Sequence, residues 1–334
     1  MNIAINGFGR IGRHSFKIGF GRKDFNIVAI NDLTDTKTLA HLLKYDTAYN
    51  VFDKEVAYDE KNIIVGGIKI PVFAEKDPSI LPWEKLKVDV VIECTGHFTK
   101  KDGAELHIKA GAKKVIISAP AKGEGVPTYV RGVNCGKVQD ETAKVISNAS
   151  CTTNCIAPVM AILEEEFGIE KAMMSTVHAY TGDQNLQDGP HKDLRRARAA
   201  AESIVPTTTG AAKAVAETIP AVKGIFDGIS LRVPVVTVSL SDITAVLKKK
   251  VTKEEINKAF VKASKTARFA GVLDATYEEL VSSDFIGNSF SSIVDLNLTN
   301  VVDGDLVKVV AWYDNEYGYA CRLVEMTELF GKIK

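Results

Sequence analysis

Cysteine is scarce in this sequence of 334 residues, and the five that occur are scattered along it. They form an odd set without any Cys-x-x-Cys pair: Cys94, Cys135, Cys151, Cys155 and Cys321. This pattern argues against a disulfide framework and against a zinc site. It suits a reducing compartment, and we expect no metal.

The sequence also lacks a net charge and a long apolar run. Its 42 basic and 42 acidic side chains balance, so no overall field draws the chain to nucleic acid or to an anionic membrane. No apolar run approaches the ~18 residues that span a bilayer, and no charged leader precedes the first apolar strand. We therefore expect a cytoplasmic protein with no membrane partner and no nucleic acid as its primary ligand.

A glycine-rich turn near the start of the chain predicts a dinucleotide site. The apolar strand Asn2–Asn6 leads into Gly7-Phe-Gly9-Arg-Ile-Gly12, a helical pattern follows over 13–20, and Asp32 ends the next strand. Gly-x-Gly-x-x-Gly alone is a weak signal. Its place between a strand and a helix, with an acidic residue about 20 positions later, makes it strong.

Each residue of this turn has a physical role in that interpretation. Gly7 permits the tight turn, Gly9 lets the backbone approach a pyrophosphate, and Gly12 lets the helix pack closely on the sheet. We expect the diphosphate at the helix N-terminus, beside Arg10 and Ile11.

Asp32 favours NAD over NADP. Its carboxylate can accept hydrogen bonds from a ribose and repels a 2′-phosphate, and Leu33 and Thr34 offer no cation for such a phosphate. The alternative is a structural glycine turn in which Asp32 only caps the end of the strand.

Short strands alternate with helical stretches through the rest of the first half. This alternation is typical of an α/β fold with a doubly wound parallel sheet, which binds ligands at the carboxyl ends of its strands. A strand over 88–94 leads into Thr95-Gly96, whose backbone could contact the cofactor, and another strand ends near Ser118. Residues 54–73 instead predict short antiparallel strands inserted into this domain.

Cys151 stands where a buried strand over 143–146 gives way to a helical pattern. The free N–H groups and the dipole at a helix start favour a thiolate, so Cys151 is a candidate nucleophile. The alternative is a small buried cysteine in a polar loop. Cys155, four residues later on the same helix face, is expected to be a buried spectator.

His178 is the best candidate base for this thiol. It lies near the end of an expected strand over 172–181, in the half of the chain that begins with Cys151. The other histidines lie in helical or loop contexts without such a partner: His14, His41, His97, His107 and His191.

A long polar segment over 180–202 contains Arg195, Arg196 and Arg198. Arginine can bind phosphate through two parallel hydrogen bonds, so this cluster is a candidate anion site. A solvated basic loop is the plainer interpretation.

Two further features of the second half are suited to anions. Thr209-Gly210 opens a helix whose N-terminus is lined with hydroxyls. Arg232 interrupts an apolar strand over 229–238. Since a buried unpaired guanidinium is costly, Arg232 meets an anion or faces the sheet edge.

The remaining pattern predicts an α+β domain with a largely antiparallel sheet. Apolar strands occur over 243–247, 289–298 and 306–312, with a hairpin turn at Asp303-Gly304 and a helix over 253–267.

Motifs in order from one end of the chain to the other resemble those of phosphorylating glyceraldehyde-3-phosphate dehydrogenases. They are Asn6-Gly-Phe-Gly-Arg-Ile-Gly-Arg13, Ser150-Cys-Thr-Thr-Asn-Cys155 with Ala157-Pro158, Thr176-Val-His-Ala-Tyr-Thr181, Asp193-Leu-Arg-Arg-Ala-Arg198, Leu231-Arg-Val-Pro234 and Trp312-Tyr-Asp-Asn-Glu-Tyr-Gly-Tyr319.

The resemblance implies a homotetramer that oxidises glyceraldehyde 3-phosphate to 1,3-bisphosphoglycerate with NAD and inorganic phosphate, in glycolysis or gluconeogenesis. Cys151 would attack the aldehyde to give a thiohemiacetal, and His178 would lower the pKa of the thiol and act as general base. Loss of hydride would leave a thioester that phosphate cleaves.

The resemblance also implies two phosphate sites. The substrate phosphate maps onto Thr181, Asp183 and Arg232. The inorganic phosphate maps onto hydroxyls, one helix start and one arginine of the cluster, and for that arginine we favour Arg195: Ser150, Thr152, Thr209, Gly210 and Arg195.

Near the nicotinamide, the resemblance places Asn315 on the amide group and Tyr319 beside the ring. Asp188-Gly189-Pro190 carries the proline of NAD-preferring members. Gly189 is a departure from the leucine common in bacterial members, and it would loosen contact with the adenosine of a neighbouring subunit.

The length predicts two domains, because single hydrophobic cores stop growing at about 250–300 residues. We place an NAD-binding Rossmann domain at residues 1–150 and the catalytic domain at 151–315, with a C-terminal helix in 316–334 packing back on the first domain.

Other functions stay open at this point. Erythrose-4-phosphate dehydrogenase shares the fold and the motifs but favours hydrolysis of the thioester, and the full set of residues for a second phosphate argues against it. A non-enzymatic redox-sensing or RNA-binding role is disfavoured by the balanced charge and the complete catalytic set.

Overall fold

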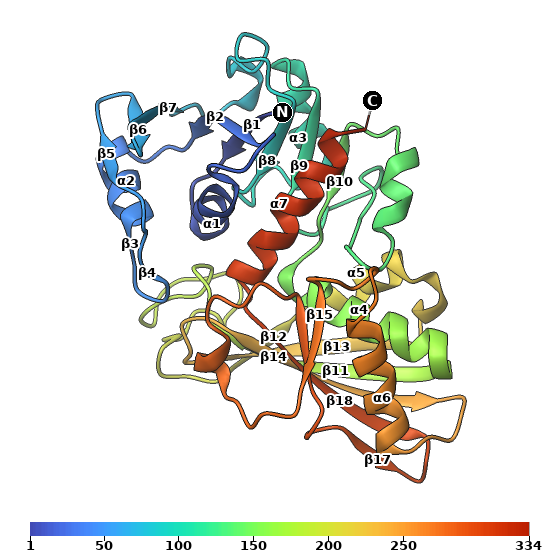
Figure 1. The fold of residues 1–334 in the computed structure, drawn as a ribbon. Helices are drawn as coiled ribbons and strands as arrows, with labels where there is room; N and C mark the ends of the chain where they lie inside the picture. Colours follow the sequence, from blue (N-terminus) through green and yellow to red (C-terminus); the bar gives the residue numbers. More distant parts are fainter. Residues whose placement is uncertain (334) are drawn as a thin grey trace. The chain divides into compact units, whose positions relative to one another are not determined.

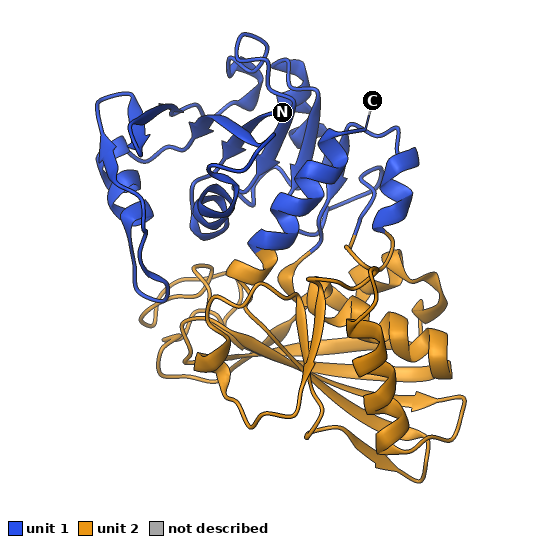
Figure 2. Ribbon diagram, in the orientation of Figure 1, with its two compact units in different colours: residues 1–129, 135–149, 320–334 blue, residues 130–134, 150–319 orange. Residues whose placement is uncertain are grey.

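The computed structural model describes residues 1–333 and divides into two compact units (Figure 2). Unit 1 comprises Met1–Tyr129, Cys135–Ala149 and the C-terminal stretch from Ala320. Unit 2 comprises Val130–Asn134 and Ser150–Tyr319. Lys334, the last residue of the expected C-terminal segment, lies outside the described residues.

Unit 1 is built on a sheet of eight strands in the order β10-β9-β8-β1-β2-β7-β6-β5 (Figure 1). In chain order these strands are β1 (Asn2–Asn6), β2 (Asn26–Asn31), β5 (Val56–Tyr58), β6 (Asn62–Val65), β7 (Ile68–Phe73), β8 (Val90–Glu93), β9 (Lys114–Ile117) and β10 (Val145–Ser147). The pairs from β10 to β7 run parallel, whereas β6 is antiparallel to β5 and β7. The predicted parallel sheet is confirmed, and the inserted antiparallel strands extend it.

The helices of unit 1 follow the pattern expected of strand–helix repeats. They are α1 (Arg10–Gly19), α2 (Thr36–Lys44), α3 (Lys101–Lys109) and most of α7 (Tyr317–Gly331), and a small hairpin is formed by β3 (Tyr45–Asp46) and β4 (Asn50–Val51). The apolar runs of β1, β8 and β9 are buried, and Trp83 at the core is fully covered. At the C-terminal end of α7, Lys114 Nζ donates to the carbonyl of Phe330 at 2.8 Å.

Unit 2 is built on a mostly antiparallel sheet in the order β12-β13-β11-β14-β18-β16-β15, with β17 paired to β18 (Figure 1). In chain order its strands are β11 (Ile169–Ala179), β12 (Val205–Thr208), β13 (Phe226–Val233), β14 (Ser239–Leu247), β15 (Leu273–Thr276), β16 (Ser292–Asp295), β17 (Asn300–Val302) and β18 (Leu306–Tyr313). The predicted, largely antiparallel sheet is confirmed. Two pairs depart from it, because β11–β13 and β15–β16 run parallel.

Three helices cover this sheet: α4 (Cys151–Phe167), α5 (Ala211–Thr218) and α6 (Lys253–Ser264). α4 packs against β14, β16 and β18, and α5 packs against α4 and β13. The helix α4 is buried along most of its length, which agrees with its apolar sequence.

The predicted strand over 229–238 is wrong at its C-terminal end, since β13 stops at Val233. Pro234 has no N–H to donate to a ladder, which confines proline to strand edges and ends. Val238 has φ 71, in the left-handed region that a β-branched residue rarely adopts, so the chain is bent there before β14 begins.

Among residues 1–333, none of the helices combines the length and the apolar character that crossing a bilayer requires. Within the same residues no cluster of His, Cys, Asp or Glu is arranged to hold a metal ion.

Candidate active site

Cys151 is the first residue of α4, at the strand-to-helix transition that its sequence predicts. Ser150 caps this helix, because its Oγ accepts the backbone N–H of Thr153 at 3.1 Å. Ala149 has φ 56, a left-handed conformation that costs a non-glycine residue about 1–3 kcal/mol. The chain is thus strained two residues before the thiol, as is common at functional sites.

His178 lies beside this thiol. It is the next-to-last residue of β11, before Ala179, and its Nε2 is 3.6 Å from Cys151 Sγ. The His178 ring is buried and makes an edge contact with Tyr313, with 6.0 Å between ring centroids. A candidate nucleophile and a candidate base are therefore within reach of each other.

The other ring nitrogen of His178 has two neighbours. Nδ1 is 2.7 Å from the carbonyl oxygen of Ala179 and 2.9 Å from Arg232 Nη1. If Nδ1 carries the hydrogen and donates it to the carbonyl, Nε2 keeps a lone pair directed at the thiol. Burial and the charge of Arg232 lower the pKa of His178 well below its ordinary value, which favours the neutral ring.

The thiol itself is subject to opposing effects. Burial raises the pKa of Cys151, whereas the charge of Arg232 and hydrogen bonding with Thr152 lower it. The helix start also favours the anion. The net effect is a raised pKa of Cys151, because burial outweighs the charge of Arg232. This differs from the thiolate that the helix start alone predicts. The thiol therefore needs the base that His178 provides.

Arg232 joins the base to a polar corner formed by Thr181 and Asp183. It lies opposite His178 across the parallel β11–β13 pair. Its Nη1 donates to Thr181 Oγ1 and to the carbonyl of Ala179, each at 3.2 Å. The Nε atom of Arg232 is buried and has no hydrogen-bond partner among the described residues. A buried donor of this kind is suited to an anionic ligand.

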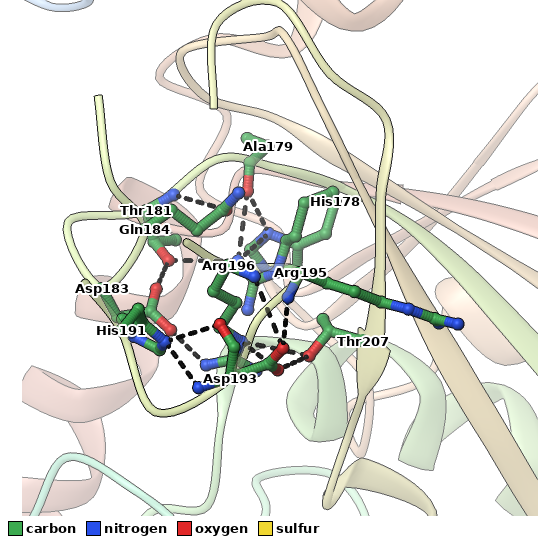
Figure 3. Close-up of polar contacts among 11 residues, drawn as sticks. His178, Ala179, Thr181, Asp183, Gln184, His191, Asp193, Arg195, Arg196 and Thr207 are labelled. Carbon is green, nitrogen blue, oxygen red and sulfur yellow. Dashed lines mark hydrogen bonds and ion pairs between the residues drawn. The ribbon is translucent and has the colours of Figure 1, made fainter. Parts of the chain in front are cut away.

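Thr181 donates a short hydrogen bond to Asp183 (Figure 3). Burial would raise the pKa of Asp183, but the bond from Thr181 and the charges of Arg232 and Arg196 hold it below its ordinary value. Gln184, which sequence reasoning missed, accepts the Thr181 N–H at 3.4 Å and has a buried Nε2 without a partner in the part of the chain that is described.

The three arginines of the cluster have different surroundings, and Figure 3 shows two of them, Arg195 and Arg196. Arg196 makes a short ion pair with Asp183 and donates to Thr207 Oγ1 at 3.0 Å. Arg198 is paired with Asp188 at 2.8 Å on the surface. The guanidinium of Arg195 is exposed and has no partner within residues 1–333. The structure thus brings Arg196 to the Thr181–Asp183 corner, whereas Arg195, which we favoured for the inorganic phosphate, has an exposed side chain.

The hydroxyls expected around the second phosphate lie at two helix starts. Thr152 Oγ1 is 4.0 Å from Cys151 Sγ and 2.9 Å from the hydroxyl of Tyr313. At the start of α5, Thr209 Oγ1 accepts the N–H of Ala211 at 3.2 Å, and Gly210 caps the helix without a side-chain bond. Both helix starts lie in unit 2.

Asn315 is buried and tied to the neighbourhood of His178. Ser239 Oγ donates to Asn315 Oδ1 at 3.0 Å and accepts the N–H of Ala179 at 3.1 Å. This leaves the amide nitrogen of Asn315 for another partner. Tyr319, the other residue expected near the nicotinamide, is 4% exposed.

The glycine-rich turn of unit 1 has the geometry that a dinucleotide site requires. Gly7 has φ 89, and a Cβ on Gly12 would lie 2.1 Å from the carbonyl oxygen of Gly7. A Cβ on Gly9 would meet nothing within 4 Å, so the space above it is open. Gly9 caps α1 without a side-chain hydrogen bond, which leaves that helix start suited to a diphosphate.

The residues around this turn are held by their own contacts. Asp32 accepts the N–H of Phe8 at 2.7 Å, so its carboxylate stands beside the turn at the end of β2. Arg10, the first residue of α1, pairs with Asp46 at 2.5 Å. Ile11 is in the first turn of α1.

Thr95 and Gly96 follow the carboxyl end of β8, which lies next to β1 in the sheet, and Ser118 follows the carboxyl end of β9, the strand on the other side of β8. Gly96 has φ 73, and Ser118 donates its backbone N–H to the carbonyl of Glu93 at 2.9 Å. Burial raises the pKa of the Cys94 thiol to about 12, which argues against a role in the chemistry. Burial raises the pKa of Cys155 in the same way, which agrees with a spectator role.

Comparisons with known proteins agree with both units. Residues 1–101 match the family model for the glyceraldehyde 3-phosphate dehydrogenase NAD binding domain, and residues 150–315 match that for its C-terminal domain. Over 326 residues the chain is 54% identical to a glyceraldehyde-3-phosphate dehydrogenase of Geobacillus stearothermophilus, covering 98% of this chain and 97% of the relative. Over 333 residues it is 56% identical to that of Thermotoga maritima, covering 99% of each. The chain therefore belongs to the glyceraldehyde-3-phosphate dehydrogenase family.

Proposed function

We propose that this chain oxidises glyceraldehyde 3-phosphate to 1,3-bisphosphoglycerate with NAD and inorganic phosphate. The observation that carries the proposal is the Cys151–His178 pair, with 3.6 Å between Sγ and Nε2 at the start of α4. Similarity to glyceraldehyde-3-phosphate dehydrogenases along nearly the whole chain supports it. The reaction is a step of glycolysis and runs in reverse in gluconeogenesis.

Cys151 and His178 carry the covalent chemistry in this proposal. Sγ attacks the aldehyde carbon while Nε2 of His178 takes the thiol proton and passes it to the carbonyl oxygen, which gives a thiohemiacetal on Cys151 and returns His178 to its neutral form. For this step His178 holds its Nδ1 hydrogen on the carbonyl of Ala179. His178 then takes the hydroxyl proton of the thiohemiacetal as the carbon is oxidised to a thioester.

NAD supplies the hydride acceptor when it is bound. The open space at Gly9 and the uncapped start of α1 support a diphosphate site, with Arg10 and Ile11 contributing backbone N–H groups. Asp32 binds a ribose. The remaining residues assigned to the cofactor flank this turn or lie in unit 2: Gly7, Gly12, Thr95, Gly96, Ser118, Asn315 and Tyr319.

The substrate phosphate binds Thr181 and Arg232, with Asp183 orienting the threonine hydroxyl. The support is the buried Nε of Arg232, which has no hydrogen-bond partner among the described residues. A phosphate oxygen at Nε would receive a charge-assisted hydrogen bond, which is about twice as strong as a neutral one.

Inorganic phosphate binds at the starts of α4 and α5, on Ser150, Thr152, Thr209 and Gly210. For its arginine we propose Arg195, because its guanidinium is exposed and has no partner within residues 1–333, whereas Arg196 is ion-paired with Asp183 at the substrate-phosphate corner.

The chain assembles as a homotetramer in the cytoplasm in this proposal. Its support is the exposed sheet face of unit 2, where Met173 is 67% exposed and Ile229 48%. These side chains and Leu306 line a hollow of about 560 Å³. Apolar side chains gathered on a sheet face are typical of an interface. The five free cysteines support a reducing compartment.

The test of the reaction is its dependence on phosphate. NADH formation from glyceraldehyde 3-phosphate is measured with inorganic phosphate, with arsenate and with neither. We expect sustained turnover only with one of the two anions, since phosphorolysis releases the acyl group. Equal rates without either would show hydrolysis, the behaviour of an erythrose-4-phosphate dehydrogenase, and would refute the proposal.

A further inference from the structure

Glu93 is a carboxylate in the middle of the core of unit 1. It is the last residue of β8, a strand that lies between β1 and β9 and is otherwise apolar, and its side chain is 1% exposed. Burying an ionised carboxylate is very costly unless hydrogen bonds satisfy its oxygens. The contacts of Glu93 therefore indicate what it does.

One oxygen of Glu93 holds the turn that follows the strand. Oε1 accepts the backbone N–H of Thr95 at 2.7 Å and also a short hydrogen bond from the Thr95 hydroxyl. The Thr95 hydroxyl oxygen in turn accepts the N–H of His97 at 3.1 Å. Gly96 between them is exposed, so a buried carboxyl group holds a turn that reaches the surface.

The other oxygen is held by residues from β1 and α3. Oε2 accepts from Asn6 Nδ2 at 2.5 Å and lies 3.1 Å from His107 Nε2. Trp83 Nε1 lies 3.0 Å from His107 Nδ1. An indole N–H can only donate, so Nδ1 is the acceptor and the ring hydrogen must be on Nε2, where it points to Glu93.

This network reaches the glycine-rich turn directly. A Cβ on Gly7 would lie only 2.7 Å from the backbone nitrogen of Thr95, so the two turns are in close contact. Any displacement of Thr95 towards Gly7 is therefore resisted by backbone atoms. The position of one turn fixes the position of the other.

The network also reaches the end of β2. Asn6 Oδ1 accepts from Asn31 Nδ2 at 2.7 Å, and the carbonyl of Asn31 accepts the N–H of Gly7 at 2.8 Å. Asn31 immediately precedes Asp32. One buried carboxylate thus connects the carboxyl ends of β8, β1 and β2, where a parallel sheet binds its ligand.

We propose that Glu93 is a positioning residue for the dinucleotide, which it holds indirectly by fixing the Thr95–Gly96 turn against Gly7. His107, kept in one tautomer by Trp83, orients the carboxylate. The inference rests on the proposed NAD function of unit 1. Since Glu93 is buried beneath the turn, its effect is on the binding of NAD and not on the chemistry at Cys151.

The test is Glu93→Gln, which keeps the shape of the side chain. The amide places an NH₂ group where both oxygens now face donors, so one side of the network must open. We expect the Kd for NAD, measured by calorimetry on the full-length protein, to rise about ten-fold or more. The KM for NAD should rise in parallel, while kcat at saturating NAD stays within about two-fold.

Asp89, which immediately precedes the first residue of β8, provides a matched control. Asp89 Oδ2 accepts the N–H of Asn2 and Oδ1 pairs with Lys113, each at 2.7 Å. Asp89→Asn disturbs a comparable set of bonds away from the turn. It should lower thermal stability and leave the Kd for NAD unchanged.

A second variant covers the case in which Glu93→Gln does not fold. Trp83→Phe keeps an aromatic ring but removes the N–H that fixes His107, and we expect the Kd for NAD to rise about three-fold. A folded Glu93→Gln or Trp83→Phe that binds NAD as tightly as the unchanged chain would overturn the inference. Failure of the unchanged chain to bind NAD would instead refute the proposed function.

Discussion

Replacing Arg232 with leucine should separate binding of the substrate phosphate from the chemistry at Cys151. The Nη1 atom of Arg232 is engaged by Thr181 and Ala179 at 3.2 Å. Its Nε is buried without a hydrogen-bond partner among the described residues. The phosphate should therefore gain at least one charge-assisted hydrogen bond that leucine cannot supply.

The size of the loss follows from that bond. A hydrogen bond to a charged group contributes about 1.5–3 kcal/mol, and about 1.4 kcal/mol is a factor of ten in rate. We therefore expect kcat/KM for glyceraldehyde 3-phosphate to fall roughly ten-fold to 150-fold. The assay compares both proteins with glyceraldehyde 3-phosphate and with glyceraldehyde, which lacks the phosphate.

The second substrate removes a complication. The positive charge of Arg232 lowers the pKa of Cys151, so its loss raises that pKa and slows attack on both aldehydes alike. This common effect cancels in the ratio of the two substrates, and the pH profile of thiol alkylation should shift upward. Arg198→Leu, which removes a surface arginine paired with Asp188, is the control. It should change neither the ratio of kcat/KM for the two substrates nor the pH profile of thiol alkylation. An equal loss on both substrates would show that Arg232 does not bind the phosphate.

Three other variants test separate parts of the proposal. Cys151→Ser should abolish NADH formation while calorimetry finds NAD bound as before, and residual turnover near the original rate would exclude the thioester. Asp32→Ala should raise kcat/KM for NADP relative to NAD by about ten-fold or more, because it removes repulsion of the 2′-phosphate; an unchanged ratio would show that Asp32 does not discriminate. Burial alone would raise the pKa of Asp89, but Lys113 and the N–H of Asn2 lower it below its ordinary 3.8. The ionised Asp89 therefore stabilises the fold above pH 3.8, and this stabilisation is lost as the pH falls through the lowered pKa. Asp89→Asn should accordingly lower the melting temperature at pH 7 and lose its effect in acid, and a pH-independent difference would contradict this assignment.

Local patterns of the sequence were sufficient to predict the glycine-rich turn, the helix start at Cys151 and the strand that carries His178. A strand, a glycine-rich turn and a helix follow one another within about 20 residues, so the presence of the turn at Gly7 can be predicted from neighbouring residues. The same holds for Cys151, because an apolar strand ahead of it and helical spacing behind it set the helix start. His178 could be placed on a strand for the same reason.

The arginine cluster could not be resolved from sequence. In a loop, neighbouring side chains follow no fixed period, so nothing local distinguishes Arg195 from Arg196. The direction of each depends on the loop conformation, which Asp193 helps to set by accepting the backbone N–H groups of both arginines. Only the folded loop shows that Arg196 reaches Asp183.

The Glu93 network was missed, although a signal was present. The segment over 88–94 predicts a buried strand through its apolar residues, and among the histidines His107 was considered only as a possible base for Cys151. An acidic residue at the end of an otherwise apolar strand is unusual, since a buried carboxylate requires donors. Those donors come from Asn6, Thr95 and His107, which are as far as 101 residues apart in the chain. Thr95 is local, but Asn6 and His107 come from other elements of the fold and were therefore beyond local patterns.

The parallel pairing of β11 with β13 explains why a mostly antiparallel sheet carries the candidate active site. Parallel strands end on the same side of a sheet, so residues near their carboxyl ends converge, and His178 stands opposite Arg232 in register. Antiparallel pairing would have placed one of them at the opposite end of the strands.

Alternating apolar residues in the sequence do not distinguish parallel from antiparallel pairing, but the length of the chain that connects the two strands does. A hairpin needs only a few residues, whereas a parallel pair needs a crossover of a dozen or more, usually with a helix. The chain between Ala179 and Phe226 is long and contains α5, so the length of this connection is the sequence feature that predicts the meeting of base and arginine.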